Sequence, residues 1–342
     1  MPRLTIRQHG ASASIPRHPI AGNLQKPEER KANRGWTAAV ARRNSQYLQR
    51  IDFERVDGTP YAVTLTLPAW QMEQVTPVVM HRLIDVMIKY LRRHGMLHFH
   101  WIIEFTARRM PHIHMSVWMA DRYEEWDRHL RQYIVWDNNE SAVVSNVVVK
   151  WLELTEAEGL HTSSNSQDVQ LIDGNEAWLV YIAKHGIRGV KHYQRALDNM
   201  PDEWRDGAGA MWGHDRKMPV ADDSVLPMDM RAFHQFRREA RKWCCAHACM
   251  IKDPHRRAKA IGQARRSNRC CRPELSVVRP VSVWIPKDVT ISIVKGLRSR
   301  GYMIGWDACQ WGVDELARLR DEGGSEERRR ILGKSLMEML RT

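Results

Sequence analysis

The sequence predicts an α+β fold, with a central antiparallel sheet flanked by helices and a basic, mainly helical C-terminal region. Two apolar segments, residues 97–106 and 112–119, are separated by a short polar joint, which favours a hairpin of two strands. Residues 77–94 place apolar side chains at helical spacing. Residues 228–272 hold thirteen Lys and Arg against three Asp and Glu, so the basic charge is concentrated there.

Three regions are expected along the chain of 342 residues, which is long enough for one large or two ordinary domains. Residues 1–55 are polar and basic, and we expect a mobile arm with one short helix near residues 37–48. Residues 56–222 are expected to form the main domain. A shift in composition at residues 220–224 separates this domain from a basic C-terminal region, residues 223–342.

The main domain is expected to begin with a turn at residues 57–60 and a strand over residues 61–67, which Pro68 ends. Pro77 opens a helix that Gly95 caps, and the hairpin follows. Trp126, Leu130 and Ile134 recur at helical spacing and predict a helix over residues 122–135. Further strands are expected at residues 143–152 and 169–173, before a helix that carries Tyr181.

The C-terminal region is expected to begin with a basic helix beside Phe233, Phe236 and Trp243. A small α/β tail should follow, with apolar segments at residues 277–285 and 290–294 and a helix near residues 325–340. The basic helix presents Arg237, Arg238 and Arg241 at helix-compatible spacing, which suits a surface that lies on DNA.

The overall charge of +13 is typical of a protein that binds a polyanion. The chain has no apolar run of 18 residues and its N-terminus lacks the apolar core of a signal peptide, so we expect a cytoplasmic protein without membrane association. The six cysteines include no CxxC spacing. Free thiols are therefore expected in place of a zinc site or disulfides.

Two histidine pairs are spaced to hold a metal ion. His112 and His114 project from the same face of their predicted strand. His98 and His100 have the same spacing, and they share a strand face with Glu104. Spacing alone therefore leaves both pairs open as ligands.

A third element lies downstream, where Tyr181 and Lys184 stand one helical turn apart. A tyrosine hydroxyl has an unperturbed pKa near 10, so it needs electrostatic help to act as a nucleophile at neutral pH. A metal-binding histidine pair, a tyrosine and a lysine in a basic protein together indicate an enzyme that cuts phosphodiesters.

These segments resemble the motifs of the HUH endonuclease superfamily, and the similarity is to rolling-circle replication initiators of filamentous phages and plasmids. Residues 63–68, Pro111–His114 with Arg108, and Tyr181–Lys184 match three motifs in the family's order. Residues 191–195, 200–201 and 209–213 resemble the stretch that trails the tyrosine. The resemblance covers roughly residues 61–219.

The resemblance implies an HUH endonuclease fold and site-specific nicking and joining of single-stranded origin DNA through a 5′-phosphotyrosine. It favours His112 and His114 over His98 and His100, because Arg108 and Pro111 precede them as in the family. Glu104, on the preceding strand, is then the expected third ligand of Mn²⁺ or Mg²⁺. Tyr181 is the expected nucleophile, and Lys184 the residue that neutralises the phosphate.

The sequence departs from the family pattern at two positions, and both affect the predicted mechanism. Where some relatives have a second tyrosine, this chain has His185, which predicts one nucleophile per subunit and leaves a homodimer open. Where relatives often have Gly, which favours a tight turn, this chain has Arg109, and we expect Arg108 and Arg109 to touch the DNA backbone. The chain has no Walker A pattern, so unwinding is expected to depend on a host helicase and replication machinery.

Other functions remain open at the level of sequence. An HUH transposase or relaxase would use the same chemistry, although relaxases place the tyrosine before the histidines. A DNA-binding regulator that no longer cuts is a second alternative. A histidine-based nucleotide hydrolase is disfavoured, because Ser116 occupies the position of its next histidine. The origin sequence, the preferred metal and the role of residues 275–342 do not follow from the sequence.

Overall fold

The computed structural model describes residues 1–15, 35–173, 186, 188–205, 207–267 and 281–305. The chain divides into two compact units, one made of Met1–Lys26 with Ala221–Thr342 and the other of Pro27–Val220. The division after Val220 lies close to the boundary expected from composition. Each unit has its own hydrophobic core.

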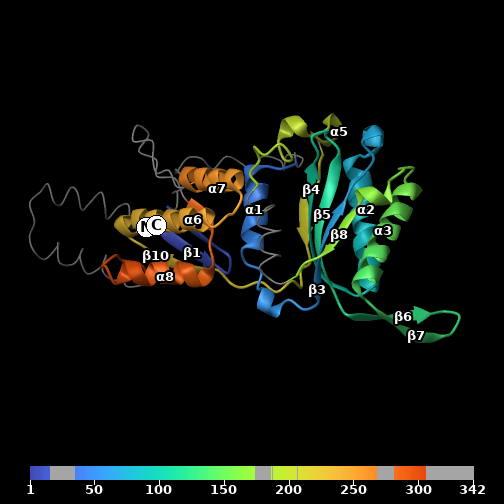
Figure 1. The fold of residues 1–342 in the computed structure, drawn as a ribbon, viewed down its shortest axis with the longest axis horizontal. Helices are drawn as coiled ribbons and strands as arrows, with labels where there is room; N and C mark the ends of the chain where they lie inside the picture. The colour runs from blue at the N-terminus through green and yellow to red at the C-terminus, as the bar shows by residue number, and fades with distance from the viewer. Residues whose placement is uncertain (16–34, 174–185, 187, 206, 268–280, 306–342) are drawn as a thin grey trace, which may run out of the picture. The chain divides into compact units, whose positions relative to one another are not determined.

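A five-stranded antiparallel sheet forms the centre of the Pro27–Val220 unit, in the order β8-β3-β5-β4-β9 (Figure 1). Its strands have these bounds: β3 Thr59–Leu65, β4 Met96–Phe105, β5 Pro111–Met119, β8 Asp168–Leu171 and β9 Trp212–His214. The α+β fold with a central antiparallel sheet is therefore confirmed. Strand β5, which carries His112 and His114, is the middle strand of this sheet.

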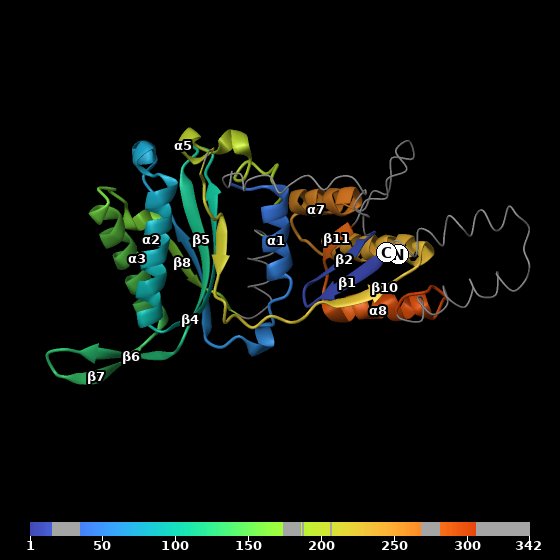
Figure 2. The ribbon, with the colours of Figure 1, turned by 180° about the vertical axis from the view of Figure 1, so that it is seen from behind.

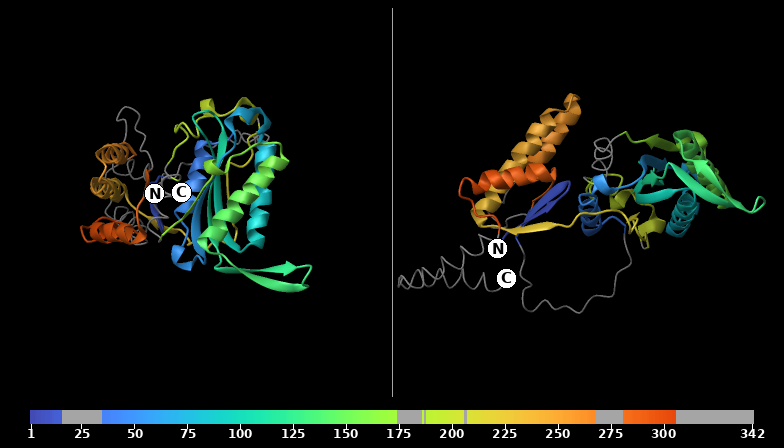
Figure 3. Two further views of the ribbon diagram at one scale, coloured as in Figure 1. Left: turned by 45° about the vertical axis from the view of Figure 1, so that its right-hand side comes forward. Right: turned by 90° about the horizontal axis from the view of Figure 1, so that it is seen from below.

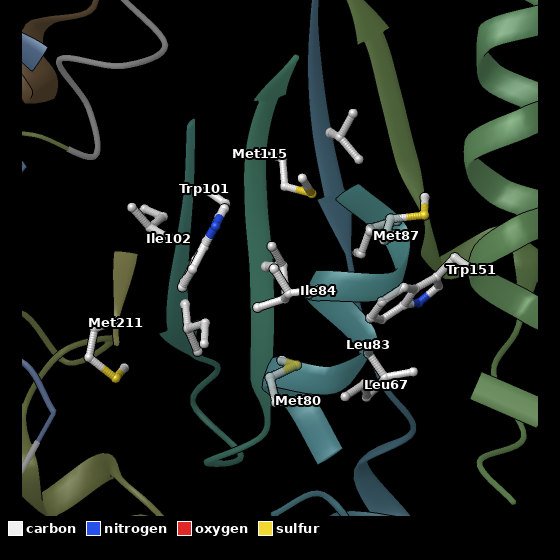
Figure 4. Close-up of a cluster of buried hydrophobic side chains, with 14 of the residues drawn as sticks. Leu67, Met80, Leu83, Ile84, Met87, Trp101, Ile102, Met115, Trp151 and Met211 are labelled. Carbon is white, nitrogen blue, oxygen red and sulfur yellow. The ribbon is translucent and has the colours of Figure 1, made fainter. Parts of the chain in front are cut away.

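Helices cover both faces of this sheet. Helices α2 (Pro77–Arg93) and α3 (Glu140–Ala157) lie on one face, and α1 (Ala38–Leu48) lies on the other (Figures 1 and 2). Between the sheet and α2, Trp101 and Met115 meet Met80, Ile84 and Met87 in a closely packed layer (Figure 4). This layer makes the sheet a rigid platform for side chains on its opposite face.

Three of the expected elements are confirmed closely, and local chemistry explains their ends. Thr76 accepts a hydrogen bond from the Val79 amide at the start of α2, and Pro77 takes the first helical position. Gly95 follows this helix with φ of +86°, the left-handed conformation that glycine adopts most easily. The hairpin of β4 and β5 and the short helix α1 also lie where they were expected.

The helix expected over residues 122–135 is wrong. This segment forms a two-stranded hairpin, β6 (Arg122–Asp127) and β7 (Gln132–Asp137), that extends away from the five-stranded sheet (Figures 1 and 3). The Asp127 carboxylate accepts hydrogen bonds from the amides of His129 and Leu130 and so stabilises the turn. The apolar stripe does not face a core, because Trp126 and Leu130 are at least half exposed.

The strand expected over residues 143–152 is also wrong, because this segment lies within helix α3. Asn139 caps the helix by accepting a hydrogen bond from the Ala142 amide. Val143, Val147 and Trp151 stand four residues apart and are all buried. Burial of this stripe outweighs the strand preference of the valines.

The other unit contains a four-stranded antiparallel sheet in the order β10-β1-β2-β11 (Figure 2). The bounds of its strands are β1 Arg3–Arg7, β2 Gly10–Ser14, β10 Ser224–Pro227 and β11 Val281–Trp284. The mobile arm expected over residues 1–55 is thus wrong for residues 3–14, which form a hairpin. Leu4, Ile6, Ala11 and Ala13 are buried in alternation, as a strand with one face on a core requires.

In the described part of this unit, three helices accompany the sheet: α6 (Met230–Cys249), α7 (Pro254–Ser267) and α8 (Lys287–Arg298). Phe233 and Phe236 of α6 join Val281 and Leu297 in its core. The C-terminal region is therefore helical and basic, as expected, but it also supplies two strands that pair with the N-terminal hairpin. The helix expected near residues 325–340 lies outside the described residues.

Short elements connect the larger ones. A four-residue helix, α5, spans Asp202–Arg205. The 3₁₀ segments are η1 Phe53–Arg55, η2 Ala69–Gln74, which has a kink at Gln71, η3 Ser164–Ser166 and η4 Leu197–Asn199.

Candidate metal centre

Glu104, His112 and His114 meet on one face of the central sheet. Glu104 lies on β4 directly opposite His112 on β5, and Ile102 lies opposite His114. Residues paired across an antiparallel ladder point to the same side, and so do residues two apart on one strand. The hairpin between β4 and β5 therefore brings one carboxylate and two imidazoles together.

The donor atoms of these three side chains all lie within 4.8 Å of one another. The Nε2 atoms of His112 and His114 are 3.0 Å apart, and Glu104 Oε2 is 3.9 Å from His114 Nε2. Two ligands that each lie about 2.1 Å from one ion, at a right angle, are about 3 Å apart. In the described part of the chain, this is the one group of three or more His, Cys, Asp or Glu that is arranged to hold a metal ion.

Polar side chains surround the two imidazoles, and one of them orients His114. The Thr64 hydroxyl on β3 lies 3.1 Å from His114 Nδ1, which leaves Nε2 directed at the candidate metal centre. Gln194 Nε2 lies 3.5 Å from His112 Nε2, the nitrogen that faces His114, so Gln194 borders the candidate metal centre itself. A contact on the nitrogen that does not face the metal, such as that of Thr64 with His114, sets the orientation and tautomer of a metal-binding histidine.

Glu104 is fully buried between two arginines. Arg195 Nε donates to Glu104 Oε1 at 2.7 Å, and Arg188 Nη1 contacts Glu104 Oε2. Burial lowers the pKa of Arg195, and the nearby Glu104 carboxylate opposes that shift. The guanidinium keeps its charge, because arginine deprotonates only at very high pH. The buried carboxylate is thus compensated by fixed positive charge.

The competing histidine pair has other partners. His98 Nδ1 lies 3.0 Å from Asp215 Oδ2, and His100 Nε2 lies 2.8 Å from Asn44 Oδ1 on α1. Both histidines share the strand face of Glu104, but neither belongs to the group of converging donors. The geometry therefore favours His112 and His114 as the ligands.

Tyr181 and Lys184, the expected nucleophile and its lysine, lie outside the described residues. Arg108 is exposed on the turn between β4 and β5. Arg109, on the same turn, has φ of +64°, the left-handed conformation that a glycine would adopt easily. Its Nη2 donates to the Met200 carbonyl at 2.5 Å and lies 3.3 Å from Asp202 Oδ1, so its guanidinium already has protein partners.

The three arginines expected on the basic helix do not share one environment. Arg238 and Arg241 are exposed on α6. Arg237 is 2% exposed, and its guanidinium lies 5.4 Å from the centroid of the Phe233 ring. The expectation that Arg237 contacts DNA is therefore wrong, because its side chain turns into the core of its own unit.

Sequence reasoning missed the residues that support the centre: Thr64, Arg188, Gln194 and Arg195. The resemblance of residues 191–195 to the stretch that trails the tyrosine assigns no role to Gln194 or Arg195. Arg195 is 91 residues from Glu104 in sequence, and no local pattern marks a pair at such a distance. Thr64 has a signal in the sequence, because it lies in the first motif, residues 63–68.

The fold and the site define a class: a basic α+β protein with a carboxylate and two imidazoles on the middle strands of an antiparallel sheet. Residues 60–154 match the model of the replication-associated protein ORF2/G2P family. The replication-associated protein G2P of Pseudomonas phage Pf3 is 30% identical over 270 residues, which cover 78% of this chain and 87% of that protein. No solved structure matches significantly.

Two proteins of Xylella fastidiosa are similar over most of their length. A protein of strain 9a5c described as a candidate replication protein is 27% identical over 318 residues, covering 89% of this chain and 99% of that protein. A second, from strain Temecula1, is 28% identical over 282 residues, covering 79% and 94% of the two chains.

The chain belongs to the replication-associated protein family of phage G2P, and it is a replication initiator of the phage and plasmid type. Binding to DNA and cooperation with replication partners follow from this membership. Among the helices that the structure describes, none is long and apolar enough to cross a membrane.

Proposed function

We propose that this replication initiator nicks and rejoins one strand of origin DNA through a covalent 5′-phosphotyrosine, in a reaction that depends on a divalent metal. The observation that carries the proposal is the convergence of Glu104, His112 and His114. The sequence pattern adds Tyr181 and Lys184, downstream in the chain, as the nucleophile and its lysine.

The donor set fits a divalent cation. Two imidazole nitrogens and one carboxylate oxygen suit Mn²⁺, with Mg²⁺ held more weakly, and they would leave further positions for water and phosphate oxygens. When bound, the cation would supply electrostatic stabilisation to the non-bridging oxygens of the scissile phosphate. Thr64 would keep the His114 imidazole turned towards it through the other ring nitrogen.

In the proposed reaction, the Tyr181 hydroxyl attacks the phosphorus of the scissile phosphodiester. The bond from phosphorus to the 3′ oxygen breaks, the tyrosine loses its proton and the leaving oxygen gains one. The products are a free 3′-hydroxyl and a 5′-phosphotyrosine. Lys184 would offset the negative charge that gathers on the phosphate. Attack by a 3′-hydroxyl on the phosphotyrosine reverses the step, so joining needs no ATP.

Recognition of DNA would be shared between the two units. Arg108, exposed on the turn that joins the strands of Glu104 and His112, would meet the phosphate backbone of the DNA. Arg238 and Arg241 of α6 lie in the most basic stretch of the chain and would hold DNA through its phosphates. A host helicase would unwind the duplex, in the cytoplasm, and a second copy of the chain is proposed to supply the tyrosine needed for termination.

The experiment uses the purified full-length protein, Mn²⁺ and labelled single-stranded oligonucleotides tiled across its own replicon. The reaction is resolved on a denaturing protein gel. We expect a covalent protein–DNA band that requires both the metal and Tyr181. Tyr181→Phe should abolish the band, and the matched variant Tyr193→Phe, at a 53% exposed tyrosine, should retain it.

Three outcomes decide the proposal. A metal-dependent band lost only in Tyr181→Phe supports it. DNA binding without an adduct in the wild type would favour a regulator that no longer cuts. An adduct that survives in Tyr181→Phe but not in Tyr193→Phe would overturn the assignment of the nucleophile.

A further inference from the structure

Arg195 connects the segment that follows Tyr181 in sequence to the candidate metal centre. Its side chain is fully buried. Its Nε donates to Glu104 Oε1 at 2.7 Å and its Nη1 donates to the Arg188 carbonyl at 2.6 Å. Its guanidinium carbon lies 3.9 Å from the centroid of the Trp36 ring. A hydrogen bond on each of two nitrogens and an aromatic ring across its face leave the guanidinium little freedom to move.

Trp36 contacts both Arg195 and the strand that carries Glu104. Trp36 Nε1 donates to the Ile103 carbonyl at 2.8 Å, and Ile103 immediately precedes Glu104 on β4. Trp36 therefore contacts the strand through its ring nitrogen and the guanidinium through the face of its ring. The position of Arg195 relative to Glu104 is fixed by both its own contacts and those of the strand.

The two carboxylate oxygens of Glu104 therefore have different partners. Arg195 contacts Oε1, while Oε2 is the oxygen that lies 3.9 Å from His114 Nε2. Arg188 differs from Arg195, because its contact is to Oε2 and its side chain is 13% exposed. A carboxylate held by one oxygen cannot rotate freely, so its other oxygen keeps a constant direction.

We propose that Arg195 is a positioning residue of the metal centre, which holds Glu104 by Oε1 so that Oε2 stays turned towards the two imidazoles. The inference rests on the metal-dependent function proposed above and adds a residue to it. Arg195 does not touch the metal or the DNA. It acts through Glu104, as residues that orient metal ligands do, and such residues typically change metal affinity by 10- to 100-fold.

Binding of Mn²⁺ alone to the full-length protein, without DNA, tests the proposal by electron paramagnetic resonance titration. Arg195→Met removes the charge and the hydrogen bonds but keeps the stem, and it should weaken Mn²⁺ binding at least tenfold. Arg195→Lys keeps the charge but not the planar fork, so it should weaken binding by a smaller factor. If the Met variant does not fold, the Lys variant decides, and wild-type affinity there overturns the proposal.

Arg92→Met is the matched control. Arg92 also pairs with a buried carboxylate, Asp215, at 2.8 Å and lies 5.4 Å from the centroid of an aromatic ring, that of Phe99. Arg92→Met should lower the midpoint temperature of thermal unfolding and leave the affinity for Mn²⁺ unchanged. If Arg195→Met lowers the midpoint in the same way but binds Mn²⁺ as the wild type does, or more tightly, Arg195 serves only the fold.

His112→Ala separates failure of this proposal from failure of the metal centre. If His112→Ala loses Mn²⁺ binding and Arg195→Met retains it, the metal centre stands and the role of Arg195 is overturned. If the wild type itself binds no Mn²⁺, both are overturned.

Discussion

Glu104 on β4 and His112 on β5 are direct partners across the antiparallel ladder, so the carboxylate and the imidazole leave the sheet on the same face. His114, two residues along β5, adds a second imidazole to that face. The register is set by the turn at residues 106–110, in which the Thr106 amide donates to the Met110 carbonyl at 2.8 Å. A shift of one residue would turn the histidines to the opposite face of the sheet.

The two histidine pairs should therefore differ in metal binding. We expect His112→Ala and His114→Ala each to weaken Mn²⁺ binding more than tenfold, because each removes a donor atom. His100→Ala is the matched control on the same sheet face. It breaks a hydrogen bond to Asn44 and should lower stability without changing Mn²⁺ affinity. Calorimetric titration of the folded variants measures this, and equal losses at His100 and His112 would contradict the assignment.

The histidine site was open to prediction because its parts are local. Glu104, His112 and His114 lie within eleven consecutive residues, and one hairpin brings them together. The buried arginines were not predictable, since Arg195 reaches Glu104 only through the tertiary fold. Tyr181 was predicted from its motif alone, and its place in the fold stays a prediction.

The errors in the predicted fold also arise from contacts that the local sequence does not show. Trp126, Leu130 and Ile134 have helical spacing, but no core faces that stripe, so the Asp127 turn decides the structure. The N-terminal segment was judged by its polar composition, although Leu4 and Ile6 alternate as in a strand. Its partners in the sheet, β10 and β11, lie more than 200 residues away in sequence.

The left-handed conformation of Arg109 predicts an order of stability. Arg109→Ala keeps the unfavourable positive φ and loses the hydrogen bonds to Met200 and Asp202. Arg109→Gly loses the same bonds but relieves the strain, so it should be more stable than the alanine variant by about 1 kcal/mol. Urea denaturation of both variants tests this, and an alanine variant at least as stable as the glycine variant would refute it.

Asp215 predicts a pH-dependent contribution to stability. Burial acts to raise the pKa of Asp215, but hydrogen bonds from the Lys217 amide, His98 and Arg92 outweigh it and hold the pKa below its ordinary value. The stabilisation is therefore present above the unfolded-state pKa of about 3.9 and is lost as the pH falls through the lower folded-state pKa.

Asp215→Asn should accordingly be less stable than the wild type at pH 7, by about 2 kcal/mol. The difference should shrink as the pH is lowered below about 4, because the Asp215 carboxylate of the unfolded chain then binds a proton while that of the folded protein stays ionised until lower pH. Urea denaturation at a series of pH values measures this dependence. A difference that stays constant down to pH 3 would show that ionisation of Asp215 is not its source.

The exposed arginines of α6 predict a change in salt dependence. Replacing both Arg238 and Arg241 by alanine should weaken DNA binding and lower the slope of log K against log salt by about 2. Arg237→Met is the control, because this buried arginine should affect stability and leave the slope of the folded protein unchanged. Fluorescence anisotropy from low to high salt provides the slopes. An unchanged slope in the double variant would remove these residues from the DNA surface.

The most direct test of the central claim is to map the covalent adduct. The wild-type protein is incubated with Mn²⁺ and an origin oligonucleotide, digested with protease and nuclease, and analysed by tandem mass spectrometry. We predict one nucleotide-modified peptide, with the phosphate on Tyr181, that is absent without metal and absent in His112→Ala. An adduct on another residue such as Tyr193, or one that forms equally without metal, would contradict the account.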